Sequence, residues 1–184
     1  MMSPITTDLD DAHWLLMVSE DDLQKAEVNK IHLCALRNEL NQGEDGQPPT
    51  NHWVVCLETS PGSCVMLDMA PGYGEDGLRG QILVTAFRGC TFTDEALRTF
   101  TYDCRATKTA SEILHMIQDK GRHSYTFSPE WEGCRYWISV VMDDLEAEGI
   151  LDTGASKDAL EHLSQYWVCP EGSQPREMRK GRFS

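Results

Sequence analysis

The chain has 184 residues and a mass of 20.8 kDa, with 40% hydrophobic and 25% charged residues, which suits one soluble domain with short tails. No apolar run reaches the roughly 18 residues of a membrane helix, and the acidic start is unlike a signal peptide. A net charge of −14 disfavours binding to nucleic acid and to anionic membrane surfaces. We therefore expect a cytoplasmic protein whose partner is a small molecule or a peptide.

The first 27 residues predict a helical extension. An apolar patch at 14–18 precedes Ser19, which can cap a helix, and the acids after Ser19 suit a first helical turn. A single α+β domain is then expected over 28–168. Residues 169–184 carry more basic than acidic side chains and are expected to form a basic C-terminal tail.

The first half of that domain predicts an antiparallel meander. Its apolar segments alternate or are rich in β-branched residues, and a Ser-Pro-Gly turn and a Gly/Pro-rich loop separate them. The predicted strands cover residues 31–40, 52–59, 64–69, 81–88 and 100–105. The glycine-rich stretch at 71–80 predicts a flexible loop that could close over a site, since it lacks the features of a phosphate-binding motif.

The second half predicts helices. Thr109 and Glu112 form a capping box, and the apolar spacing that follows predicts a helix ending at Gly121. A second helix is expected to begin near Ser128 or just after Gly133, to end at 149 and to include Cys134 on its core face. A third is expected over 156–167. The fold class is thus α+β, an antiparallel sheet packed on helices.

Seven cysteines at irregular spacing form no disulfide framework and include no CxxC pair. We predict no metal site and no cofactor, and expect most thiols to be small buried apolar groups.

Cys134 differs from the other cysteines because it opens a predicted helix. The helix dipole and free N–H groups of a first turn stabilise a thiolate. Gly133 before it allows close approach of the backbone to a substrate, and the N–H of Cys134 could hold an oxyanion. The plainer interpretation is a small core residue on a helix.

A reactive thiol also requires a base. Among the histidines, His52 is the strongest candidate because it opens a strand directly after the Gly/Pro-rich loop. Asp68 on the next strand could orient the imidazole if the hairpin register places both side chains on one face. The plainer interpretation of His52 is a capping or half-buried histidine bonded to backbone.

Several neighbours of the two motifs are candidate substrate-binding residues. The aromatic side chains could form the walls of a groove or belong to the core, and the acid could face a cationic substrate. Arg135 could bind a carboxylate or pair with Glu130 or Glu132. The candidates are Trp53, Trp131, Trp137, Glu130 and Arg135.

The histidine in "NHWVVCLE" and the later cysteine in "GCRYWISVV" resemble the motifs of circularly permuted papain-like proteins, including the lecithin:retinol acyltransferase-like and permuted NlpC/P60 groups. The resemblance implies a papain-like arrangement with Cys134 as nucleophile, His52 as base and Asp68 as the orienting residue. The chain departs from the acyltransferase branch because no second histidine follows the Pro61-Gly62 turn.

The string "YTFSPEWEGCRYWISVVMDDLEAEGIL", together with "PREMRKGRF", is similar to a fungal family of small proteins of unknown function. The resemblance implies an enzyme of fungal specialised metabolism. The leading hypothesis is a thiol-dependent transferase or hydrolase acting on an amide or ester bond of a small metabolite or peptide. The alternatives are a non-covalent cyclase or isomerase and a binding protein with a relic site.

Overall fold

The computed structural model describes residues 9, 12–39, 41, 46, 48–89, 95–168 and 172–184. Cys90, Cys169 and nearly all of Met1–Asp11 lie outside the described residues. The helices are α1 Glu20–Lys25, α3 Ala110–Asp119, α4 Cys134–Ala147 and α5 Ala155–Leu163. The strands are β1 Trp14–Leu16, β2 Glu27–Leu36, β3 His52–Ser60, β4 Ser63–Tyr73, β5 Arg79–Arg88, β6 Arg98–Thr109, β7 Tyr125–Thr126, β8 Gln165–Trp167, β9 Ser173–Pro175 and β10 Arg182–Phe183.

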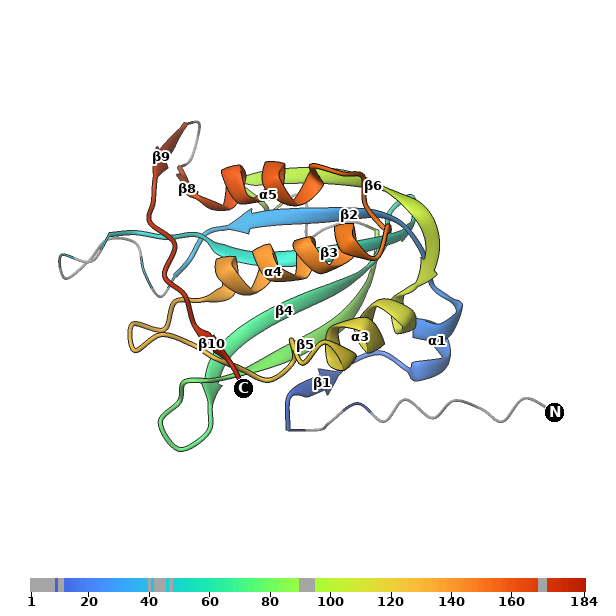
Figure 1. Cartoon of the computed structure of the whole chain (residues 1–184), viewed down its shortest axis with the longest axis horizontal. Coiled ribbons are helices and arrows are strands. Elements are labelled where there is room, and N and C mark those ends of the chain that lie inside the picture. Colours follow the sequence, from blue (N-terminus) through green and yellow to red (C-terminus); the bar gives the residue numbers. More distant parts are fainter. Residues whose placement is uncertain are drawn as a thin grey trace.

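One large, mainly antiparallel sheet is packed on helices. Its strand order among the described residues is β10-β7-β5-β4-β3-β2-β6, and β1 adds to β5 in parallel. The helices α3, α4 and α5 lie together in front of the sheet in Figure 1, and the side view separates the two layers, with Tyr136 and Glu161 on the helical side and Met17 and Glu39 on the other. The expected α+β fold with an antiparallel meander is confirmed.

The two faces of the sheet follow the period-two alternation of the strands. Odd-numbered residues of β2 to β4, such as Leu33, Val55 and Leu67, are buried in the core between sheet and helices. Even-numbered residues form a second apolar cluster on the far face, which contains the buried thiols Cys34, Cys56 and Cys64. The buried, apolar role expected for these cysteines is confirmed.

The meander parts at one end. The β3–β4 pairing runs only as far as Val55 opposite Leu67. Beyond that pair β3 stays with β2, with His52 opposite Leu36, and β4 stays with β5, with Asp68 opposite Leu83. The opening between the two strands lies next to His52 and Asp68.

Helix starts follow their caps. The Thr109–Glu112 capping box is present at α3, which confirms the prediction. Of the two predicted starts of the next helix, the structure has the one after Gly133. Gly133 is required there by close packing, because a Cβ at this position would lie 2.7 Å from Tyr125 Oη.

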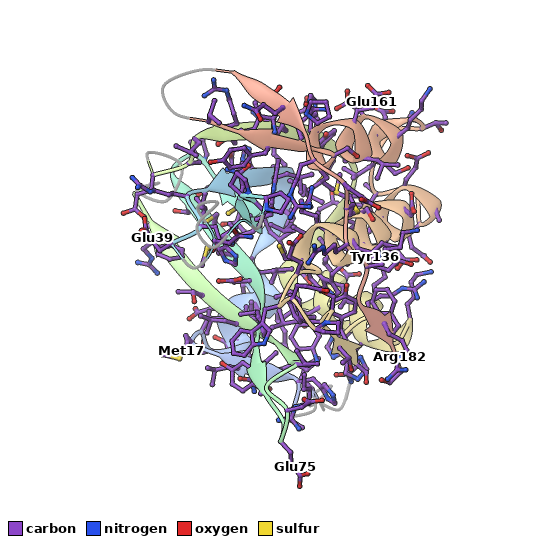
Figure 2. The ribbon with its side chains drawn as sticks, turned by 90° about the vertical axis from the view of Figure 1, so that its left-hand side faces the viewer. Met17, Glu39, Glu75, Tyr136, Glu161 and Arg182 are labelled. Atoms are coloured by element: carbon purple, nitrogen blue, oxygen red, sulfur yellow. The ribbon has the colours of Figure 1, made fainter. Side chains whose placement is uncertain are left out.

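Two segments differ from their predicted structure. The apolar patch expected to be helical forms β1, since its backbone pairs with Ile82 and its neighbours on β5, whereas Ser19 does cap α1. Only residues 74–78 of the glycine-rich stretch expected to be a loop lie outside strands, because β4 continues to Tyr73 and β5 starts at Arg79. Glu75 marks the tip of this hairpin in Figure 2.

The end of the chain is also more structured than expected. α5 stops at Leu163, and the last predicted helical residues form β8, paired with β9. β10 pairs with β7, so the basic tail joins the large sheet. Among the described residues, no helix is both long and apolar enough to span a membrane.

Candidate active site

A cavity of about 350 Å³ lies between the parted strands and the start of α4. One side is formed by His52, Met69 and Pro71 at the strand ends. The other is formed by Phe127 and residues 130–135, which lead into the helix. Asparagines and Thr50 from the segments that flank the loop before β3 complete the lining.

His52 and Asp68 form an ion pair in this region. The His52 Nε2 and Asp68 Oδ1 atoms are 3.0 Å apart, and the two side chains are 30% and 19% exposed. Both residues are even-numbered members of adjacent strands, so the register through the Pro61-Gly62 turn gives them the same face, the one that carries the second apolar cluster. His52 nevertheless lines the cavity with Cys134, because it stands where β3 and β4 part. The structure therefore brings together the histidine and the carboxylate in the way the hairpin register required.

Cys134 lies on the opposite wall of the cavity as the first residue of α4. Across the cavity, its thiol interacts electrostatically with the His52 ring. Cys134 is half-buried: it lines the cavity and also packs against the main core, as expected for the core face of this helix.

The electrostatics of the site favour a protonated imidazole. Burial lowers the pKa of His52, but hydrogen bonds with Asp68 and Cys134, and the negative charges of both groups, outweigh burial and raise the pKa to about 10. His52 is therefore an imidazolium at neutral pH, placed between a carboxylate and a sulfur. The positive charge of the imidazolium thus lies in the cavity that Cys134 also lines.

The backbone before Cys134 is held by Tyr125 on β7. The Tyr125 hydroxyl donates a hydrogen bond to the Gly133 carbonyl at 3.0 Å and accepts one from the Gly181 N–H at 2.8 Å. No described side chain caps α4. The first-turn N–H groups, which have no intrahelical acceptors, are thus left at the cavity end of the helix.

Two of the candidate substrate-binding residues line the cavity with exposed side chains. Trp131 is 52% exposed and adopts a φ of 59°, which is uncommon for a bulky residue. Its ring packs over Gly77 in the β4–β5 hairpin tip. Glu130 lies beside it, 3.4 Å from Arg179 between charged atoms.

Arg135 also borders the cavity, but its guanidinium is used by the protein. The side chain is buried and donates hydrogen bonds to the carbonyls of Leu163, Arg176 and Glu177. It also lies 3.6 Å from Glu132. The pairing alternative therefore describes Arg135 better than carboxylate binding.

Trp53 and Trp137 require a correction. Both are fully buried in the main core and are absent from the cavity lining. Trp53 stacks near Phe100, and the Trp137 indole N–H donates to the Arg122 carbonyl at 2.8 Å. Their large apolar side chains stabilise the interface between sheet and helices instead of forming the walls of a groove.

Sequence reasoning missed Met69, Pro71 and Phe127 in the lining, and it missed the buried contact between Glu132 and Arg176. Met69 and Pro71 closely follow Asp68, and Phe127 precedes Cys134 in the same segment, but the fold decides which of these side chains face the cavity. Arg176 lies in the string "PREMRKGRF", which indicates only a family similarity and no role for the arginine. Among the described residues, no group of three or more histidine, cysteine or acidic side chains is placed to hold a metal ion.

Comparison with known proteins gives a family without an assigned activity. No curated protein and no solved structure matches the chain. A family model described as "Domain of unknown function (DUF7770)" matches residues 31–184, which include β3, α4 and the whole C-terminal tail. The chain therefore belongs to the DUF7770 family.

Proposed function

We propose that this protein is a cysteine-dependent acyl-transfer enzyme that acts on an ester or amide bond of a small metabolite or peptide. The observation that carries the proposal is that Cys134 and His52 line one cavity from two separate elements, with Asp68 on a third element paired with His52. A thiol next to an imidazole, with the imidazole paired with a carboxylate, is the general arrangement of an activated cysteine nucleophile.

The first chemical step starts from a charged pair. With His52 protonated, the sulfur of Cys134 attacks the substrate carbonyl as a thiolate, and a carbon–sulfur bond forms. The bond from that carbon to the leaving alcohol or amine then breaks, and the leaving group takes the proton from His52. An acceptor amine, alcohol or water next attacks the thioester, gives its proton to His52 and releases the thiolate.

The start of α4 supplies the second requirement of acyl transfer. The tetrahedral intermediate carries negative charge on the former carbonyl oxygen. The Cys134 N–H lies in the uncapped first turn at the cavity wall, where it can donate to that oxygen. The helix dipole adds a favourable field at the same point.

The cavity also favours a functional site over a relic. A relic site would be filled by its own side chains, whereas this cavity has a volume of about 350 Å³, within the range of small-molecule sites. Met69, Pro71, Phe127 and Trp131 give it apolar walls around the polar pair. These walls suit an acyl group with an apolar body.

The proposed arrangement is the permuted papain-like one. It is supported by the chain order, because a histidine on an early strand precedes a cysteine that opens a later helix, with a carboxylate on the intervening strand. The separate similarity to a fungal family of small proteins supports a role in fungal specialised metabolism, and the acidic composition supports a cytoplasmic location.

Intact-mass spectrometry tests the activity. The protein is incubated with p-nitrophenyl acetate, hexanoate and benzoate, and each acyl adduct is located by peptide mapping. We expect one acyl group on Cys134, a burst of p-nitrophenol and loss of both in Cys134→Ala. Cys104→Ala is the matched control, since Cys104 is a half-buried thiol on β6 outside the cavity lining. A Cys134→Ala protein with unchanged ester turnover would refute the proposal.

Alkylation separates this activity from the non-covalent alternative. Iodoacetamide should inactivate a covalent enzyme at the rate at which it modifies Cys134. A cyclase or isomerase that uses only His52 would keep its activity in Cys134→Ala. A binding protein would show a thiol of ordinary reactivity at this position.

A further inference from the structure

The region just before each proposed catalytic residue is tied to one buried side chain in the C-terminal tail. Arg176 is 8% exposed. Its Nη2 donates to Glu132 Oε1 at 2.6 Å, two residues before Cys134. Its Nε and Nη2 donate to the carbonyls of Pro49 and Pro48 at 3.0 and 3.2 Å, in the segment before His52.

Arg176 is in turn held firmly by its own backbone. Its N–H donates to the Ser164 carbonyl at 2.9 Å. Its carbonyl accepts a hydrogen bond from Arg135 Nη1 at 3.0 Å. The guanidinium is therefore fixed between α4, α5 and the segment that enters β3, and Figure 1 shows the tail passing the start of α4 on its way from β9 to β10.

The shape of the guanidinium matters here. A planar fork with several N–H groups can donate in different directions at once, whereas a lysine ammonium is a compact point charge on a flexible stem. Glu132 is itself 9% exposed, so its carboxylate needs a charged donor in the same place. Arginine can both donate in several directions and place a positive charge beside Glu132. Lysine can do only the latter.

We infer that Arg176 is a positioning residue, which sets the distance between the Cys134 sulfur and the His52 ring by joining the two segments that carry them. The inference rests on the proposed function, because Arg176 would act only through Cys134 and His52. It assigns Arg176 no contact with substrate. The inference predicts a specific effect of Arg176→Lys, a substitution that keeps the positive charge. The ion pair with Glu132 can persist while the link to Pro48 and Pro49 is lost.

The test is the pH profile of Cys134 alkylation. The rate of carboxamidomethylation by iodoacetamide is measured at Cys134 by peptide mass spectrometry from pH 5 to pH 10. In the native protein we expect Cys134 to be alkylated faster than Cys104 across this range, because Cys134 lines the cavity beside the His52 imidazolium. In Arg176→Lys we expect the Cys134 rate at pH 6 to fall about ten-fold or more and its dependence on pH to change, because the sulfur and the ring are no longer held together.

The control is Arg182→Gln, a change to an exposed arginine in the same tail. It should keep the native profile. Far-UV circular dichroism and the urea midpoint establish that Arg176→Lys is folded under the assay conditions. If Arg176→Lys is insoluble, Glu132→Gln is measured in the same way, because it weakens the link on the Cys134 side alone and should shift the profile in the same direction.

The possible outcomes separate the two proposals. A folded Arg176→Lys protein, or failing that Glu132→Gln, with the native alkylation profile would overturn the positioning role and leave the proposed function standing. A native protein whose Cys134 reacts like a free thiol would overturn the proposed function and the positioning role together.

Discussion

At the scale of single residues, the His52–Asp68 pair connects chemistry with stability. Its imidazole has a pKa of about 10 in the folded protein, against about 6.5 in an unfolded chain. Between these values the folded state binds the proton and the unfolded state does not. The resulting stabilisation is complete below pH 6.5 and is lost as the pH rises through 10.

We therefore expect the free energy of unfolding to fall between pH 6.5 and pH 10, with a slope of up to about 1.4 kcal/mol per pH unit from this residue. Urea unfolding at pH 6, 8 and 9.5 measures the slope. His52→Gln cannot titrate in this range, so its slope should be flatter than that of the native protein. Equal slopes in the two proteins would contradict the raised pKa.

Some single residues could be predicted from the sequence and others could not. The pairing of His52 with Asp68 and the position of Cys134 at a helix start could be predicted, because the start of β3, the start of α4 and the hairpin turn all have local sequence signals. Their catalytic role stays a prediction. The burial of Trp53 and Trp137 could not be read in the same way. Which side of a strand or helix faces the core depends on what packs against it.

At the scale of elements, the start of α4 depends on the fit between Gly133 and Tyr125. We expect Gly133→Ala to cost about 1 to 3 kcal/mol, the usual range for overpacking, because the added Cβ would lie 2.7 Å from Tyr125 Oη. It should also slow Cys134 alkylation, since the backbone next to the sulfur must move.

Gly149→Ala at the other end of α4 is the matched control. This glycine has a φ of 69° and open space around it, so alanine there should cost about 1 to 2 kcal/mol from backbone conformation alone. Urea unfolding and alkylation kinetics are compared for the two variants. Equal alkylation rates in both would show that the Gly133–Tyr125 fit does not place the sulfur.

The elements themselves were predicted where local chemistry decides them. The capping box of α3 and the alternation of β2 to β5 are local, and both were confirmed. The helix predicted for the apolar patch at 14–18 was wrong, because the patch forms the three-residue strand β1, whose backbone partners come from β5. A pairing between segments so distant in sequence leaves no local signal.

At the scale of the whole molecule, the segment expected to be an extension is part of the fold. Trp14 is 3% exposed, belongs to the main core and donates to Gln118 on α3 at 3.1 Å. We expect Trp14→Ala to cost about 3 to 5 kcal/mol. Leu15 is 43% exposed, and Leu15→Ala should change stability by less than about 0.5 kcal/mol. Urea unfolding measures both, and similar small losses would mean that β1 is peripheral.

The apolar cluster on the far face of the sheet gives the molecule an internal reporter. Cys34, Cys56 and Cys64 lie on three consecutive strands and are shielded from solvent, so a bulky thiol reagent can label them only when the strands separate. Their labelling rates would follow transient opening of the meander strand by strand, with no fluorophore or engineered cysteine needed. Such pulse-labelling would reveal whether the sheet opens as one cooperative unit or opens locally from the end that carries His52.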